Sequence, residues 1–224
     1  MVSREFVPRP YQHQIVDHII QVPRCAVWAG MGMGKTSATL TALDALMLAG
    51  EVGKVLVVAP LRVARTTWPE EAPKWNHLKH LKVVPIVGDV AQRKRALIED
   101  ADIFTVGYEC LPWLVSHWQY SWPYDTLVLD EATKLKSARI QQGSKRAAEL
   151  QTVVYSKVKR VIELTGTPAP NGLADLYGQM LLLDRGQRLG RTYTAFENRW
   201  FGFQRAQDAV SNGRNYVKRI AFPH

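Results

Sequence analysis

The chain has 224 residues, of which 46% are hydrophobic and 22% are charged, and its formal net charge is +9. This composition suits one large globular domain with a buried core, with or without a small appendage. The two cysteines, Cys25 and Cys110, lie far apart, which excludes a disulfide scaffold. No apolar run has signal-peptide or membrane-spanning length, so we expect a cytoplasmic protein with no membrane partner. The excess of basic residues favours a polyanionic partner such as nucleic acid.

Short apolar runs alternate along the chain with longer helical patterns. The runs are rich in β-branched residues and mostly lack polar alternation, which is typical of strands buried on both faces of a parallel sheet. The expected strands are 26–29, 55–59, 83–87, 103–106, 127–129 and 161–164. The expected helices lie near 11–21, 35–49, 61–76, 91–99, 109–118 and 141–157. This alternation predicts an α/β sandwich whose strands are joined by crossover connections.

The alternation weakens after Leu183. Residues 184–224 are polar and basic, and they show no further cycle of strand and helix. We therefore expect one domain over residues 1–183, followed over 184–224 by a basic extension that is helical or partly ordered. A second basic cluster lies between Lys134 and Lys159, where Glu149 is the single acid. Such clustering is expected of a surface that follows phosphates, although a solvated helix face would look the same.

The first expected strand runs into a glycine-rich turn, Gly30-Met31-Gly32-Met33-Gly34-Lys35-Thr36, and a helix follows. In this context backbone N–H groups and a helix N-terminus bind phosphate oxygens. We expect Met31, Gly32, Met33 and Gly34 to surround the phosphates of ATP, Lys35 to reach the β- and γ-phosphates, and Thr36 to offer its hydroxyl to magnesium. Ala29 stands where the strict pattern has glycine, and the alternative is a turn with no ligand.

A second motif is the apolar run 127–129 followed by the adjacent carboxylates Asp130 and Glu131. Asp130 can hold magnesium and Glu131 can orient or deprotonate the attacking water. The carboxyl ends of strands form the ligand crevice of open α/β sheets, so both motifs can face one site. Taken alone, the two carboxylates would more simply belong to a solvated turn.

Two weaker motifs follow the same logic. Residues 164–171 again place a polar loop after a strand. There the hydroxyls of Thr165 and Thr167 could bond the carboxylates of Asp130 and Glu131 and report the state of the γ-phosphate. The alternative is a plain turn of glycine, proline and asparagine. Near the start, Gln12 follows Arg9-Pro10-Tyr11, and its amide has the donors and the acceptor that suit an adenine edge.

Together these segments resemble the first motor lobe of superfamily-two helicases, and most closely the Swi/Snf-type DNA translocases. Arg9-Pro10-Tyr11-Gln12 resembles their adenine-reading motif, 31–36 motif I, 130–133 motif II and 164–171 motif III. Residues 57–61, with Trp68 and Trp75 behind them, resemble motif Ia, and 105–109 stand in the place of motif Ib. The similarity covers roughly residues 7–183. The chain departs from the family at Ala29-Gly30, at Thr133 where histidine is common, and at Pro170 where glutamine is frequent.

The resemblance implies a three-layer RecA-like P-loop NTPase lobe with a central, mostly parallel sheet, which hydrolyses magnesium-ATP and grips double-stranded DNA by its backbone. Lys35, Asp130 and Glu131 would be catalytic, with magnesium on Thr36 and Asp130. Thr165, Gly166 and Thr167 would couple hydrolysis to motion. By the same resemblance, the candidate DNA contacts are Arg62, Thr105 and Tyr108. A second RecA-like lobe, supplied by a longer protein or by another chain, would complete the motor, so this chain alone should turn over ATP slowly.

Other readings remain open at this stage. The chain could be an ATP- and DNA-binding module without useful turnover, a viral DNA-packaging ATPase, or an RNA helicase of the same superfamily. The departures from the family pattern suggest a phage or prokaryotic origin, and therefore the host cytoplasm if the protein is viral. For His77 and His80 a solvated helix end is favoured over zinc. The aromatic residues between Trp113 and Tyr124 are expected to pack under a loop rather than stack on bases.

Overall fold

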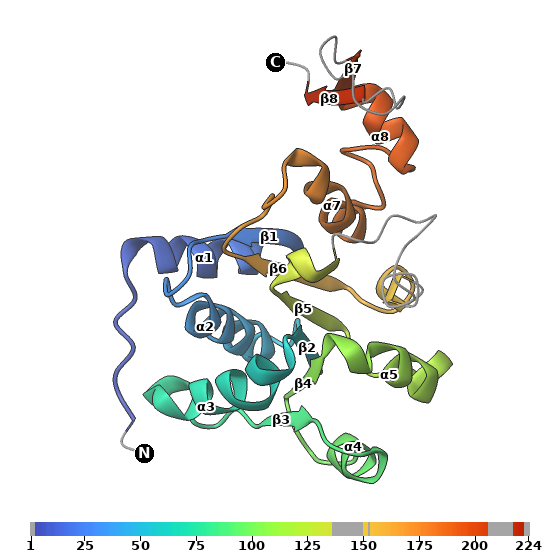
Figure 1. Cartoon of the computed structure of the whole chain (residues 1–224). Helices are drawn as coiled ribbons and strands as arrows, with labels where there is room; N and C mark the ends of the chain where they lie inside the picture. Colours follow the sequence, from blue (N-terminus) through green and yellow to red (C-terminus); the bar gives the residue numbers. More distant parts are fainter. Residues whose placement is uncertain (1–2, 136–149, 152, 206–216, 222–224) are drawn as a thin grey trace.

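The fold is built on a six-stranded parallel sheet (Figure 1). The structure is a computed structural model, and it describes residues 3–135, 150–151, 153–205 and 217–221. The strands are arranged in the order β1-β6-β5-β2-β4-β3. They are β1 Arg24–Trp28, β2 Val55–Ala59, β3 Val83–Ile86, β4 Ile103–Gly107, β5 Thr126–Asp130 and β6 Arg160–Thr165. All six predicted strands are confirmed, each end falling within two residues of its predicted position.

Burial explains why these runs form strands in the interior of a sheet. Every residue of β2 and of β4 is buried, as expected for strands covered on both faces. The parallel pairing brings the carboxyl ends of neighbouring strands to one edge. Trp28 lies opposite Thr165, and Asp130 lies opposite Leu164. Motifs that follow β1, β5 and β6 in the sequence therefore meet in space.

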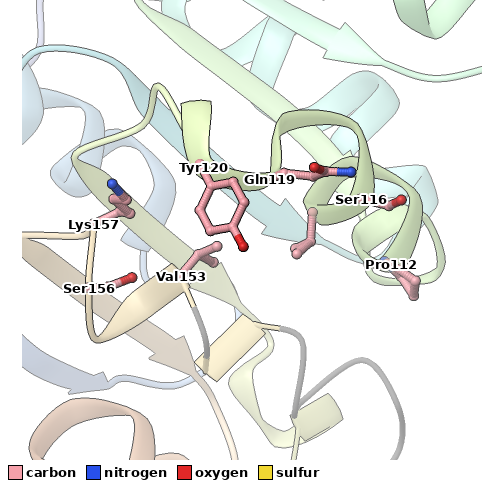
Figure 2. A pocket seen from close by; sticks show the side chains of 8 residues that line it. Pro112, Ser116, Gln119, Tyr120, Val153, Ser156 and Lys157 are labelled. Carbon is pink, nitrogen blue, oxygen red and sulfur yellow. The ribbon is translucent and has the colours of Figure 1, made fainter.

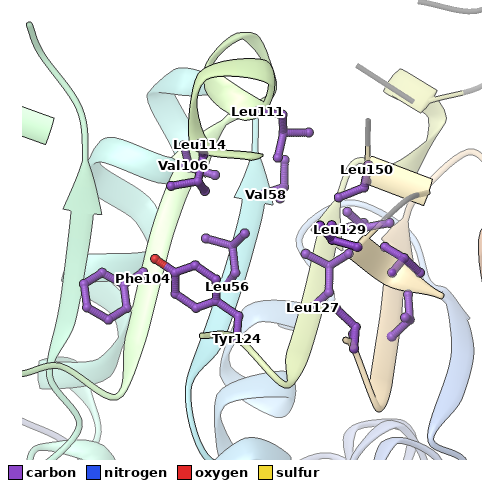
Figure 3. Close-up of a cluster of buried hydrophobic side chains, with 14 of the residues drawn as sticks. Leu56, Val58, Phe104, Val106, Leu111, Leu114, Tyr124, Leu127, Leu129 and Leu150 are labelled. Carbon is purple, nitrogen blue, oxygen red and sulfur yellow. The ribbon is translucent and has the colours of Figure 1, made fainter. Parts of the chain in front are cut away.

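Helices cover both faces of the sheet and make the three layers that the sequence predicted (Figure 1). One face is covered by α1 Pro10–Gln21, α2 Lys35–Leu48 and α3 Trp68–Glu71. The other is covered by α4 Val90–Leu97, α5 Leu111–Trp118 and α7 Leu176–Asp184. Figure 3 shows the core on this second face, where Leu56, Phe104 and Tyr124 pack between the strands and α5. The predicted three-layer α/β fold is thus confirmed.

The prediction of one regular helix over 61–76 is wrong, because the segment is divided into several short helical turns. The structure has a π-helical turn, η1 Val63–Thr67, then the short α3, then the 3₁₀ turns η2 Ala72–Lys74 and η3 Asn76–Leu78. Pro69 and Pro73 explain the interruption, because proline cannot donate to the carbonyl four residues before it. The predicted helix 109–118 is likewise divided into the 3₁₀ turn η4 Tyr108–Cys110 and α5. The remaining 3₁₀ turns are η5 Gln119–Ser121, η6 Ala132–Leu135 and η7 Leu173–Asp175.

The C-terminal part contains α8 Tyr193–Trp200 and two antiparallel strands, β7 Phe201–Arg205 and β8 Val217–Ala221. This strand pair was not predicted. A small cluster of Tyr177, Leu181, Phe196 and Phe201 packs α8 and the start of β7 against α7. Most of the predicted helix 141–157 lies outside the described residues, as do Lys136, Arg139, Lys145, Arg146 and Arg214. Within the described part of the chain, no helix combines the length and the apolar character needed to cross a membrane.

Candidate functional site

The glycine-rich turn connects the end of β1 to the first residue of α2. Gly32 and Gly34 have φ angles of +75° and +70°, which residues with a Cβ adopt only with strain. A Cβ on Gly34 would lie 2.3 Å from the Nε2 atom of Gln12. The loop therefore needs glycine at position 34 for two reasons, its backbone conformation and the close approach of α1. It leads into the N-terminus of a 14-residue helix, where N–H groups and the helix dipole favour an anion.

The side chain of Lys35 lies across this loop. Its Nζ atom donates to the main-chain oxygens of Ala29 at 2.7 Å and Gly30 at 2.9 Å. Partial burial lowers the pKa of this ammonium group, while the nearby carboxylates of Asp130 and Glu131 act in the opposite direction. The cation thus stands between the phosphate loop and motif II, where a γ-phosphate would need it.

Gln12, in the first turn of α1, packs its side chain against the phosphate loop. Its side chain is 8% exposed. The Oε1 atom accepts from the N–H of Arg9 at 2.9 Å, and the Nε2 atom donates to the main-chain oxygen of Met33 at 3.5 Å. Close by, a cavity of about 540 Å³ lies between α1 and β1, with Tyr11, Trp28 and Met33 in its lining. Gln12 does not line this cavity, and its two hydrogen bonds connect the start of α1 to the phosphate loop.

One cavity of about 360 Å³ brings three of the motifs together. Of the residues that the sequence predicted for the site, its lining contains Met31, Gly32, Gly34, Lys35, Thr36, Asp130, Glu131, Thr165 and Gly166. Gln12, Met33 and Thr167 do not line it. Thr36 and Asp130 line the same cavity, and a hydroxyl and a carboxylate are hard oxygen donors of the kind that suits magnesium. Among the described residues, no group of three or more His, Cys, Asp or Glu side chains is arranged to hold a metal ion.

The carboxylate of Asp130 is held from the α3 side. Its Oδ2 atom accepts from the indole Nε1 of Trp68 at 2.9 Å, and its main-chain oxygen accepts from the hydroxyl of Tyr108 at 2.8 Å. Burial raises the pKa of Asp130, while the bond from Trp68 and the charge of Lys35 work against this rise. The next residue, Glu131, is exposed and has a φ angle of +56°. This left-handed conformation turns the main chain sharply after Asp130, so β5 ends there and the chain leaves the direction of the strand.

Motif III lies directly against the phosphate loop. The main-chain oxygen of Thr165 accepts from Ala29 N at 3.2 Å, and a Cβ on Gly166 would come within 3.4 Å of Met31 N. The Thr165 hydroxyl was expected to bond the motif II carboxylates, but it accepts instead from the N–H of Thr167 at 3.1 Å. The contact between motif III and the nucleotide loop is therefore made by main-chain atoms, which residue types alone do not reveal.

Two of the three candidate DNA contacts must be corrected. Thr105 is fully buried and its hydroxyl donates to the main-chain oxygen of Ala64 at 2.6 Å. Tyr108 is 3% exposed and donates to Asp130. Both side chains point into the protein, because β4 is covered on both faces and its turn folds back on motif II. Arg62, at the start of η1, is exposed and remains a candidate.

The sequence did not single out the wall formed by η1 and α3. Val63, Thr67 and Glu71 line the nucleotide-loop cavity, four residues apart and so on one side of a helix. Glu71 accepts from the indole of Trp75 at 3.0 Å and from Lys74 at 2.9 Å. The spacing of four is the signal that could have found these residues, although the prolines of this segment disguise it.

The features given a structural interpretation from the sequence behave mostly as expected. The Nε2 atom of His77 lies 2.9 Å from the Thr41 hydroxyl, and that of His80 lies 2.7 Å from Asp44 Oδ1. Trp122 and Tyr124 are buried in the core. Tyr120, by contrast, is 90% exposed beside a cavity of about 420 Å³ between α5 and residues 153–157 (Figure 2). This cavity shares no lining residue with the nucleotide-loop cavity.

The matches to known proteins agree with this geometry. A profile of the SNF2-related domain matches residues 11–220 of the chain. The chain belongs to the SNF2-related domain family. The Swi/Snf resemblance predicted from the motifs is therefore confirmed, and the family match includes α8 and the β7–β8 pair.

Two relatives of this SNF2-related chain come from a phage and from a fungus. Protein p41 of Acyrthosiphon pisum secondary endosymbiont phage 1 is 53% identical over 200 residues, which cover 88% of this chain and 44% of p41. Helicase SWR1 of Mycosarcoma maydis is 33% identical over 159 residues, which cover 68% of this chain and 8% of SWR1. The p41 match is consistent with the phage or prokaryotic origin predicted from the sequence.

A solved structure gives the same assignment. The Sulfolobus solfataricus SWI2/SNF2 ATPase core in complex with dsDNA superposes with a TM-score of 0.72 at 27% identity, covering 88% of this chain and 39% of that one. The SNF2-related chain thus spans less than half the length of these relatives. It is a helicase-like domain of the SNF2 family with the RecA-like fold.

Proposed function

We propose that this chain is the ATP-binding first lobe, residues 1–183 with the extension 184–224, of an ATP-dependent double-stranded DNA translocase. The observation that carries the proposal is the meeting of Lys35, Thr36, Asp130 and Glu131 at one cavity. These are the residue types that phosphoryl transfer requires, since positioning and charge neutralisation account for most of its catalysis.

Each residue has a distinct task in this proposal. The N–H groups of residues 31–36 and the start of α2 bind the phosphates, and Lys35 neutralises charge near the γ-phosphate. Thr36 and Asp130 would hold magnesium, which when bound polarises the phosphate oxygens. Glu131, exposed at the mouth of the cavity, orients or deprotonates the attacking water. The cavity beside Tyr11 and Met33 would take the base. Gln12 does not line this cavity and its amide is bonded to Arg9 and Met33, so reading the adenine edge would require Gln12 to exchange these bonds for the base.

Two observations support double-stranded DNA as the partner. The SNF2 core of Sulfolobus solfataricus, to which this chain is similar over 88% of its length, was solved in complex with dsDNA. The chain also carries a formal net charge of +9 and presents the exposed Arg62 at the carboxyl edge of the sheet. Phosphate contacts of this kind give binding that is independent of sequence and weakens with salt.

The proposal includes a second RecA-like lobe, from a longer protein or from another chain, that contributes the remaining catalytic groups. An arginine supplied by such a lobe is worth about a thousandfold or more in rate. Thr165, Gly166 and Thr167 would transmit the state of the phosphate loop to that lobe, because motif III bonds the loop through its main chain.

The deciding experiment measures ATP binding and hydrolysis by the 224-residue chain, with and without duplex DNA, beside Lys35→Ala and Glu131→Gln. We expect the unmodified chain and Glu131→Gln to bind magnesium-ATP, Lys35→Ala to bind at least about tenfold more weakly, and turnover to stay near background. Equal binding by Lys35→Ala would contradict the nucleotide site. Fast, DNA-stimulated turnover that Glu131→Gln abolishes would instead show a self-sufficient motor. Competition by duplex RNA distinguishes the two nucleic acids.

A further inference from the structure

The side chain that lies behind Asp130 is a fully buried tryptophan. Trp68 has no exposed surface and packs in the core that α1, α2 and α3 form against the sheet. Its indole N–H donates to Asp130 Oδ2 at 2.9 Å, across 62 positions of sequence. An indole nitrogen can only donate, so the carboxylate supplies the partner that a buried tryptophan needs.

The packing around Trp68 holds its indole ring in one position, so the hydrogen bond to Asp130 is fixed from the protein interior. Trp68 begins α3, and the side chains on either side of its helical face, Ala64 and Ala72, are fully buried as well. The ring cannot swing without disturbing that packing, since cores hold side chains in single rotamers. Charge-assisted bonds of this type are shorter and stronger than neutral ones. Together with the Tyr108 bond to the main chain, the indole fixes both ends of Asp130.

The Trp68 bond engages one carboxylate oxygen and so determines how the other is presented. Asp130 and Thr36 line the same cavity, in which Val63, Thr67 and Glu71 form the wall nearest Trp68. We propose that Trp68 is a positioning residue that orients the Asp130 carboxylate for magnesium, so that the η1–α3 segment is part of the nucleotide site. This inference rests on the proposed function. Groups that orient metal-binding carboxylates typically change metal affinity by about 10–100-fold when they are removed.

The chain offers a matched pair of variants for the test. Trp68→Phe removes the indole N–H and keeps most of the apolar volume. Trp122→Phe makes the same chemical change at another buried tryptophan, whose Nε1 has no hydrogen-bond partner among the described residues. Binding of a non-hydrolysable ATP analogue is titrated with magnesium chloride, and again in EDTA, for both variants and for the unmodified chain.

We expect Trp68→Phe to lower magnesium affinity by about 10–100-fold while analogue binding in EDTA is unchanged. Trp122→Phe should match the unmodified chain in both conditions. In an Asp130→Asn background, Trp68→Phe should have no further effect on magnesium, because the two groups act as one unit. Equal magnesium affinity in Trp68→Phe and Trp122→Phe would overturn the inference and leave the proposed function standing. Failure of the unmodified chain to bind the analogue at all would overturn both.

A second measurement needs no variant at position 68 and so covers the case in which Trp68→Phe does not fold. With ¹⁵N-labelled tryptophan, the indole resonance that moves in Asp130→Asn belongs to the side chain bonded to that carboxylate. In the unmodified chain this resonance should shift when magnesium is added to the analogue complex, and the Trp122 resonance should not. A resonance that stays fixed on magnesium addition would contradict the inference.

Discussion

The hydroxyl of Tyr108 donates to the main-chain oxygen of Asp130 at 2.8 Å, joining the end of β4 to the end of β5. The two strands are not neighbours, because β2 lies between them in the sheet. The bond therefore passes over the carboxyl edge of β2 and ties motif Ib to motif II directly. Burial, followed by the charge of Asp130, raises the pKa of the Tyr108 hydroxyl well above its usual value, so it stays a donor at any physiological pH.

Tyr108→Phe tests the corrected role of this side chain. The change leaves the Asp130 oxygen without its donor, and we expect the free energy of unfolding to fall by about 1–3 kcal/mol in urea denaturation. Affinity for duplex DNA and its salt dependence should not change, since the hydroxyl does not reach the surface. Tyr120→Phe, at a 90% exposed side chain, is the stability control. Arg62→Ala is the DNA control, and it should reduce the slope of log affinity against log salt by about 1. Weaker binding of duplex DNA by Tyr108→Phe, at an unchanged salt slope, would restore the direct contact with DNA.

Gly34 and Gly50 have nearly the same backbone conformation, so replacing each with alanine separates the effect of backbone strain on stability from the effect on nucleotide binding. Gly34 and Gly50 have φ angles of +70° and +72°, so alanine should cost about 1–2 kcal/mol of stability at either position. A Cβ on Gly50 meets nothing within 4 Å, whereas one on Gly34 displaces the Gln12 amide. We expect only Gly34→Ala to lose ATP-analogue binding, measured by calorimetry. Equal analogue affinity in the two variants would mean that the loop tolerates a side chain at its last position.

Much of the fold could be predicted because burial on both faces leaves a plain signal in the sequence. β2 and β4 are apolar at nearly every residue. The phosphate loop could be predicted because Gly34, Lys35 and Thr36 are the residue types that phosphate and magnesium binding require. The η1–α3 segment was harder, since Pro69 and Pro73 break a helix whose apolar pattern continues. Orientation was harder still. Thr105 has the residue type of a phosphate contact, but only the packing of β4 against Ala64 shows that it points inward.

Contacts distant in sequence were beyond prediction from one chain. The bond from Trp68 to Asp130 depends on where α3 packs on the face of the sheet relative to the end of β5, and no local pattern encodes that position. The β7–β8 pair likewise depends on a connection of eleven residues, between Arg205 and Val217, rather than on a short hairpin turn with its own signature.

Arg160 provides a stability prediction away from the nucleotide loop. From the first position of β6, its guanidinium donates to the main-chain oxygens of Ile19 at 2.6 Å and Ile20 at 3.2 Å, which end α1. Arg160→Met keeps the length of the side chain but leaves these carbonyls without donors. We expect a loss of about 2–3 kcal/mol in urea denaturation. Lys159→Met, at the exposed neighbouring position, should stay within about 0.5 kcal/mol. Equal effects of the two changes would assign the loss to charge rather than to helix capping.

Glu163 makes the stability of the chain depend on pH. It lies in the middle of β6 with no exposed surface, and neither carboxylate oxygen has a hydrogen-bond partner among the described residues. Burial raises its pKa well above the ordinary value of 4.5. At pH values between the unfolded and the folded pKa, the folded state therefore keeps a proton on Glu163 that the unfolded state has released. The stability contributed by the neutral form is fully present below about pH 4.5, and it is lost as the pH rises toward the folded pKa.

Glu163→Gln removes this titration while keeping the shape of the side chain. Each pH unit between the unfolded and folded pKa values costs the unmodified chain about 1.4 kcal/mol, and the variant should not show that cost. The difference in the free energy of unfolding, variant minus unmodified chain, should therefore grow as the pH is raised from 5 to 8. Urea denaturation at several pH values measures it, and Glu51→Gln, at an exposed carboxyl that lies 3.4 Å from the guanidinium of Arg160, is the comparison. Parallel curves for Glu163→Gln and the unmodified chain would mean that the carboxyl has the same pKa in the folded and the unfolded state, which would contradict the effect of burial.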